Sequence, residues 1–191
     1  MSERDPELQR LFDREAISSV VIGWGRAADR LDFDLMRRLF HPDAIDEHGA
    51  FTGSVDELIE WVRARHRRIV FSMHQISNIT VEFAADDRAV AESYVRTVQR
   101  YPAEAAEQLA QLTGGRVGAA DKTVDLLTCS RYIDRFERRA GEWRIAHRLL
   151  IPDWKQLTEV PDGDPWSDPS NFVGSRDRQD PLYRVLEEMG L

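Results

Sequence analysis

The spacing of apolar residues changes near residue 70, from every third or fourth position to every second, and this change divides the chain. Before it, residues 6 to 30 carry apolar side chains at helical spacing, with Asp5 as a cap and Pro6 in the first turn. The apolar positions are Leu8, Leu11, Phe12, Ile17, Val20, Val21 and Trp24. The pattern predicts one long helix whose apolar side faces a core.

Two shorter helices are expected next. One begins after Asp32 and stops before Pro42, because the residue before a proline is biased out of the helix. Residues 44 to 53 then contain two glycines and predict a short strand or hairpin. Residues 54 to 70 open with a capping box, Ser54 followed by Glu57, and continue as a helix.

From residue 72 apolar and polar residues alternate, which is typical of strands. The four expected strands cover residues 72 to 84, 88 to 101, 122 to 139 and 142 to 154. Residues 102 to 121 form an insertion with room for one short helix. Helices followed by long antiparallel strands predict an α+β fold, a strongly bent sheet wrapped around the N-terminal helices to make a cone with an apolar interior.

The chain divides into a domain at residues 1 to 155 and a C-terminal arm at residues 156 to 191. The arm is rich in proline, aspartate and glycine and is expected to be irregular, except for a terminal helical turn at residues 182 to 189.

Composition narrows the class of protein. Hydrophobic residues make up 42% and charged residues 31%, as in an ordinary soluble globular protein, and the net charge of −8 argues against a nucleic-acid partner. The single cysteine, Cys129, excludes an internal disulfide and a cysteine zinc cluster, which fits a reducing compartment. No apolar run is long enough for a membrane span and the N-terminus is charged, so we expect a cytoplasmic protein without a membrane partner.

The sequence "SMHQISN" at residues 72 to 78 places His74 in a strand, on the same side as Ile76 and Asn78. A strand histidine is either a buried structural imidazole or a base that needs a carboxylate. Asp29, at the end of the first helix, is one such carboxylate, although it could also pair in solvent with Arg26 or Arg30.

Three longer stretches carry a resemblance to a known family. These are "AADRLDFDLMRRLFHPDA" (27 to 44), "SMHQISN" (72 to 78) and "YIDRFERRAGEWRIAHR" (132 to 148). Their order resembles the SnoaL-like branch of the NTF2-like superfamily over about residues 10 to 155. Members such as scytalone dehydratase, hexachlorocyclohexane dehydrochlorinase and a bile-acid dehydratase look similar at Asp29 and His74. The resemblance implies an Asp–His dyad that abstracts a proton from carbon while a leaving group departs.

The resemblance also implies roles for other residues. Arg148 falls where the dehydrochlorinase has an arginine that assists the leaving group, and Asn78 extends the match at His74. His48 and Trp24 stand where relatives have tyrosines, so phenolic donors are missing and the substrate class is not carried over. As alternatives, Arg148 could form a surface ion pair with Glu82 or Glu92, and His48 could only brace a turn.

Two further assignments rest on the strand pattern alone. Tyr94 is a candidate for the pocket wall or for plain packing, and only one of His147 and Arg148 can face a pocket because the two alternate along a strand. His41 and His66 are expected at the surface.

These observations predict a cofactor-independent lyase, with no metal, acting on a small hydrophobic cyclic or aromatic compound. An isomerase with the same dyad and a non-catalytic ligand-binding protein stay open as alternatives. Because the outer face of the sheet must also be covered, we expect a homo-oligomer, a dimer or a trimer.

Overall fold

The structure is a computed structural model that describes residues 5–119, 121–161 and 173–191. Helix α1 (Pro6–Arg30) has the predicted bounds, and the Asp5 carboxylate accepts a hydrogen bond from the backbone N–H of Glu7 at 2.9 Å. Helix α2 (Phe33–Leu39) begins after Asp32, whose side chain accepts from the backbone N–H of Leu35. Both predicted caps are therefore confirmed, because capping depends on local sequence alone.

The segment after α2 forms a hairpin. Strand β1 (Phe40–His48) begins as soon as α2 ends, and it turns through Gly49, at a φ of 69°, into β2 (Phe51–Ser54). Helix α3 (Val55–His66) follows at once, and Ser54 with Glu57 forms the predicted capping box. No residue lies between α2 and β1 or between β2 and α3, so α3 is held close to the open end of the hairpin.

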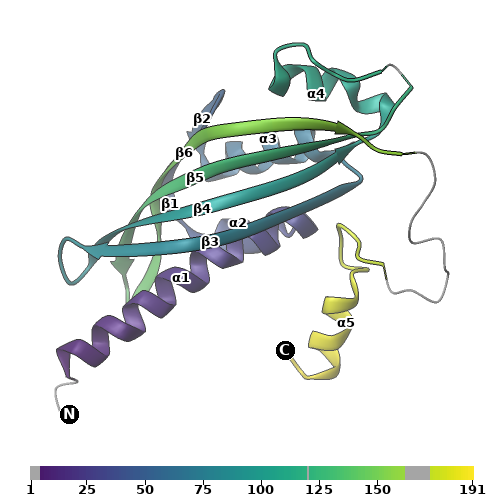
Figure 1. Ribbon diagram of the computed structural model, residues 1–191. Helices are drawn as coiled ribbons and strands as arrows, with labels where there is room; N and C mark the ends of the chain where they lie inside the picture. Colours follow the sequence, from purple (N-terminus) through teal and green to yellow (C-terminus); the bar gives the residue numbers. More distant parts are fainter. Residues whose placement is uncertain (1–4, 120, 162–172) are drawn as a thin grey trace.

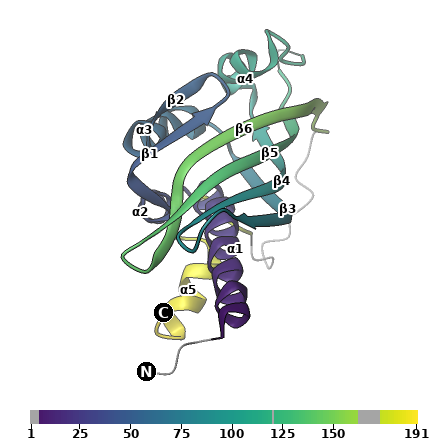
Figure 2. The ribbon, with the colours of Figure 1, turned by 90° about the vertical axis from the view of Figure 1, so that its left-hand side faces the viewer.

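The long strands are β3 (Phe71–Phe83), β4 (Arg88–Tyr101), β5 (Val124–Arg139) and β6 (Glu142–Glu159). They pair antiparallel in sequence, and β1 adds to β6 to give the order β2-β1-β6-β5-β4-β3. The β1–β6 pairing is parallel, so the six-stranded sheet is mixed rather than wholly antiparallel. The sheet is open and bends around α1, with α2 and α3 on the same concave side (Figures 1 and 2).

The predicted insertion carries a 3-10 turn at Ala103–Ala105 and helix α4 (Ala106–Thr113). Leu109 of α4 packs with Tyr101 and Leu126 in a small apolar cluster, separate from the main core beneath α1. Helix α4 thereby lies over the wide end of the bent sheet, at the opposite end from the N-terminus of α1 (Figure 1).

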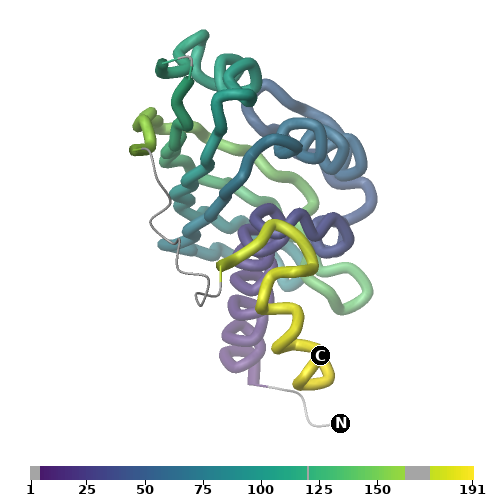
Figure 3. The backbone as a smooth tube through the Cα atoms, turned by 90° about the vertical axis from the view of Figure 1, so that its right-hand side faces the viewer, coloured from purple at the N-terminus to yellow at the C-terminus, as the bar shows by residue number. Residues whose placement is uncertain are grey.

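The C-terminal segment lies beside the end of α1 (Figure 3). Helix α5 (Pro181–Glu188) contains most of the predicted terminal helical turn. Ahead of it, Arg176 donates to the backbone carbonyls of Asp29 at 3.2 Å and Ile69 at 2.8 Å. Strand β6 crosses the predicted boundary at residue 155 because it stays paired with β5 as far as Glu159, and residues 162–172 of the arm lie outside the described residues. The division into domain and arm stays a prediction.

None of the helices in the described ranges is long and apolar enough to cross a membrane.

Candidate functional site

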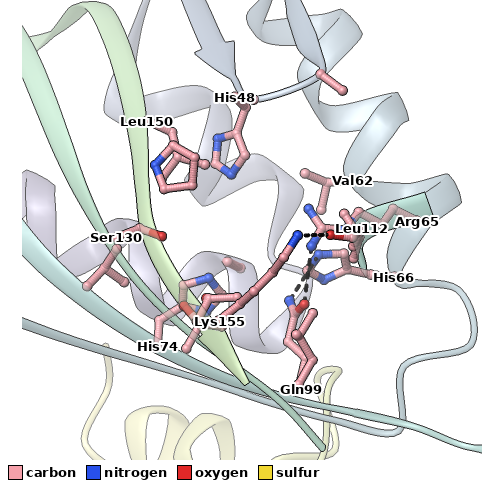
Figure 4. Close-up of a pocket in the computed structure, with 18 of the residues that line it drawn as sticks. His48, Val62, Arg65, His66, His74, Gln99, Leu112, Ser130, Leu150 and Lys155 are labelled. Carbon is pink, nitrogen blue, oxygen red and sulfur yellow. Dashed lines mark hydrogen bonds between the residues drawn. The ribbon is translucent and has the colours of Figure 1, made fainter. Parts of the chain in front are cut away.

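A cavity of about 290 Å³ lies between the concave face of the sheet, the end of α1 and helix α3. Its walls are mainly apolar and include Trp24, Val62, Val95 and Leu150, while helix α4 contributes Leu112 at the rim. Figure 4 shows His48 and His74 projecting into this space from different elements, with Lys155 of β6 near His74. The volume suits one small organic molecule.

Asp29 and His74 meet at the cavity wall, as the sequence predicts. The imidazole Nδ1 lies 2.7 Å from Asp29 Oδ1, and the two side chains are only 8% and 7% exposed. The carboxylate also accepts from Ser72 Oγ at 2.9 Å and from the backbone N–H of His74 at 2.8 Å. Three donors therefore fix Asp29, and an ionised carboxylate so placed holds the proton of His74 on Nδ1 and leaves Nε2 as an acceptor.

The close approach of α1 to β3 depends on Gly25. A Cβ added there would lie 3.3 Å from the Cβ of His74 and 3.3 Å from Cδ1 of Ile76, tighter than an ordinary contact. Gly25 is one helical turn before Asp29, so the missing side chain lets the end of the helix reach the strand that carries His74.

Arg148 does not line the cavity. Its guanidinium is completely buried and donates two 2.7 Å hydrogen bonds to Asp134, a residue of the neighbouring strand. It is stacked over the rings of Trp24 at 4.8 Å and Tyr132 at 4.2 Å. The predicted assistance to a leaving group is wrong for this geometry, and so is the alternative of a surface ion pair, because the arginine lies one layer beneath the wall.

His147, the neighbour of Arg148, points to the side, where its Nε2 lies 2.7 Å from Glu47 Oε1. Neither of the two residues therefore lines the cavity, although one of them could have faced it.

The predicted tyrosine replacements do line the cavity. Trp24 donates its indole N–H to the hydroxyl of Tyr132 at 3.1 Å, and His48 stands near both rings. Burial raises the pKa of Tyr132 to about 12, so its O–H stays protonated and remains a donor. Sequence reasoning missed this phenol, although Ser130, Tyr132 and Asp134 alternate on one face of β5.

Asn78 and Tyr94 lie outside the cavity, which corrects both predictions. Asn78 has a φ of 48° at an irregularity between Ser77 and Thr80, which breaks the alternation and leaves its side chain exposed. Tyr94 is 46% exposed on the convex face, next to Arg131 in the register of the sheet.

His41 and His66 are buried, whereas the sequence placed them at the surface. His41 Nε2 lies 2.9 Å from the carbonyl of Glu137, and His66 lines the cavity next to Gln99 and Arg176. Burial, with the cations Arg65 and Arg176 nearby, holds the pKa of His66 well below its ordinary value of 6.5. At neutral pH it is an uncharged part of the wall.

Across residues 5–119, 121–161 and 173–191, no three side chains of histidine, cysteine, aspartate or glutamate are grouped so that they could hold a metal ion.

Comparison with known proteins places the chain in a family. The profile of the SnoaL-like domain matches residues 9–149. Among solved structures, the Kfla4162 protein from Kribbella flavida is 21% identical, with a TM-score of 0.62 over 77% of this chain and 95% of that one. A type 2 LinA hexachlorocyclohexane dehydrochlorinase is 17% identical, with a TM-score of 0.64 over 86% and 99%.

A scytalone dehydratase candidate from Novosphingobium aromaticivorans is 18% identical, with a TM-score of 0.62 over 85% of this chain and 98% of that one. No curated protein matches the chain in sequence. At such identities the structural likeness shows the NTF2-like fold, and the profile match shows the family.

Proposed function

This chain belongs to the SnoaL-like family, and we propose that it is a cofactor-independent lyase acting on a small hydrophobic ring compound. In this proposal His74 takes a proton from a carbon of the substrate while a group leaves from the adjacent carbon. Asp29 keeps the imidazole in one tautomer and stabilises the imidazolium that forms. The observation that carries the proposal is the 2.7 Å contact of His74 with Asp29 at the wall of a mainly apolar cavity.

The chemistry follows from the position of the free nitrogen. With Nδ1 committed to Asp29, Nε2 of His74 is the atom that can accept a proton from a bound molecule. General-base assistance by such a group contributes on the order of 10²- to 10⁴-fold to the rate. The apolar walls hold the ring of the substrate, and the Tyr132 hydroxyl offers a donor to the group where negative charge develops.

The names of two structural neighbours, a dehydrochlorinase and a scytalone dehydratase candidate, both describe eliminations, which supports a lyase. The burial of Arg148 favours isomerisation as the second candidate. An isomerase moves a proton between carbons without a leaving group, so it needs no cation at that place. The same dyad serves either reaction.

Incubation of the protein with hydroxylated and halogenated ring compounds in deuterium oxide separates these candidates. Mass spectrometry reads loss of water or halide for a lyase, and NMR reads solvent deuterium moved into a rearranged product for an isomerase. His74→Ala or Asp29→Asn should abolish turnover, and the double variant should be scarcely worse than the worse single one. Gln75→Ala, an exposed neighbour on the opposite face of β3, is the matched control. Full activity of His74→Ala on a confirmed substrate would overturn the proposal.

A further inference from the structure

A second carboxylate lies beside a second cavity histidine. Asp46 and His48 are two residues apart on β1 and therefore share one face of the sheet. His48 Nδ1 lies 3.2 Å from Asp46 Oδ1, within hydrogen-bond distance although the angle is not that of a formed bond. Asp46 is completely buried and its oxygens have no formed hydrogen bond within the described part of the chain, so the His48 N–H is a candidate donor for them.

A permanent cation stands next to Asp46 in the sheet. Across the parallel β1–β6 pairing, Asp46 stands in register with Arg148, a permanent cation. If the Asp46 carboxylate accepts a hydrogen bond from His48, Nδ1 carries the proton and Nε2 is left as an acceptor. Burial lowers the pKa of His48 below its ordinary value of 6.5, and this outweighs the opposing effect of Asp46. The imidazole is therefore neutral at neutral pH.

Three rings fix the direction of the His48 side chain. The centroids of Trp24, Trp61 and Tyr132 lie 6.4, 5.6 and 6.1 Å from the centroid of the imidazole. Figure 4 shows His48 projecting into the cavity from the hairpin side, while His74 comes from β3. Three imidazoles thus line the cavity, and two of them, His48 and His74, have a carboxylate behind them.

We propose that the Asp46–His48 pair is a binding site for a hydroxyl group, so that the natural ligand is a ring compound whose hydroxyl donates to Nε2 of His48. A hydroxyl satisfies this acceptor, but a halogen or a carbonyl oxygen brings only lone pairs to it. The second half of the inference, that this ligand is the substrate whose carbon faces His74, rests on the proposed function.

The test compares para-cresol with para-fluorotoluene, which has fluorine in place of the hydroxyl. Binding to the full chain is followed by NMR with nitrogen-labelled histidine, which reports both the dissociation constant and the tautomer of each ring. We expect para-cresol to bind about 5- to 10-fold more tightly than para-fluorotoluene, the effect of one neutral hydrogen bond. Only para-cresol should shift the Nε2 signal of His48.

Two phenylalanine variants distinguish this binding site from the proposed catalytic dyad. The dissociation constant and the tautomer are both measured without turnover. His48→Phe should bind both probes equally, whereas His74→Phe should keep the preference for para-cresol. Asp46→Asn, which leaves the ring in place, should give a mixture of the two His48 tautomers. Equal binding of the probes by the wild-type protein overturns the inference, as does a His48 proton found on Nε2. A preference lost only in His74→Phe also overturns it and leaves the proposed lyase dyad untouched.

Discussion

Replacing Arg148 by methionine should lower the free energy of unfolding strongly, although Arg148 contributes nothing to the protein surface. The change removes two 2.7 Å charge-assisted hydrogen bonds and leaves the Asp134 carboxylate, which has no exposed area, without its cation. Breaking a buried ion pair by removing one partner costs about 3 to 5 kcal/mol. The lost stacking of the guanidinium on Tyr132 and Trp24 adds to this.

That loss is large compared with the stability of a domain, about 5 to 15 kcal/mol. With a urea dependence of about 2 to 3 kcal/mol per molar, the midpoint of unfolding should fall by about 1 to 2.5 M. Urea denaturation followed by circular dichroism measures the shift. Arg131→Met is the control, because Arg131 pairs with Glu92 and Asp153 on the outer face of the same sheet, where solvent screens the charges. Its midpoint should hardly move.

The variant Asp134→Leu should be destabilised in a similar way, since it leaves Arg148 buried and uncompensated. The double variant, with leucine at 134 and methionine at 148, restores a neutral interior and should recover most of the loss. If the Arg148→Met midpoint moves no more than that of Arg131→Met, the buried pair does not carry the energy assigned to it here.

Three further predictions concern stability and assembly. The pKa of His66 in the folded protein lies well below its ordinary value of 6.5, which applies in the unfolded chain. As the pH falls below about 6.5, the unfolded chain therefore binds a proton at His66 before the folded protein does. The free energy of unfolding should decrease over this range. His66→Gln should flatten this dependence in urea titrations at several pH values, and an unchanged slope would contradict it. Arg176→Met removes hydrogen bonds to the backbone carbonyls of Asp29 and Ile69 near the end of α1. It should lower the melting temperature more than Arg178→Met, because the side chain of Arg178 is mostly exposed. Equal melting temperatures of the two variants would refute this. We propose that the convex face, with exposed Tyr94 and Trp154, makes a homo-oligomer. Light scattering should give a multiple of the 22.0 kDa chain mass, and a monomer at micromolar concentration would count against it.

The elements that follow from local signals are predictable from this sequence. The bounds of α1 and the capping box of α3 depend on residues within a few positions, and β4 is an alternation bounded by polar residues. The parallel contact of β1 with β6 joins segments about 100 residues apart, so no local pattern contains it. The length of β6 likewise depends on its partner β5.

The buried position of Arg148 depends on one irregularity in the β5–β6 pairing. Phe136 stands opposite Ile145, but Arg135 stands opposite His147, so Ala146 is an extra residue on β6. This bulge brings Arg148, rather than His147, opposite Asp134. Counting back from the hairpin turn without the bulge gives the other pairing. The dyad was predictable from the family resemblance, whereas the partner of Arg148 required the register.

The Arg148–Asp134 pair also lies directly behind the proposed hydroxyl site. A buried ion pair is often no more stable than well-packed apolar residues of the same volume, so stability alone does not explain its presence. Its guanidinium stacks on Trp24 and Tyr132 of the cavity wall and stands in register with Asp46. The double variant with leucine at 134 and methionine at 148 should therefore fold stably and yet lose its preference for para-cresol over para-fluorotoluene. Without the cation in register with it, Asp46 is expected to hold the proton of His48 on Nδ1 less firmly. A stable double variant that retains the full preference would show that Asp46 sets the tautomer of His48 without Arg148.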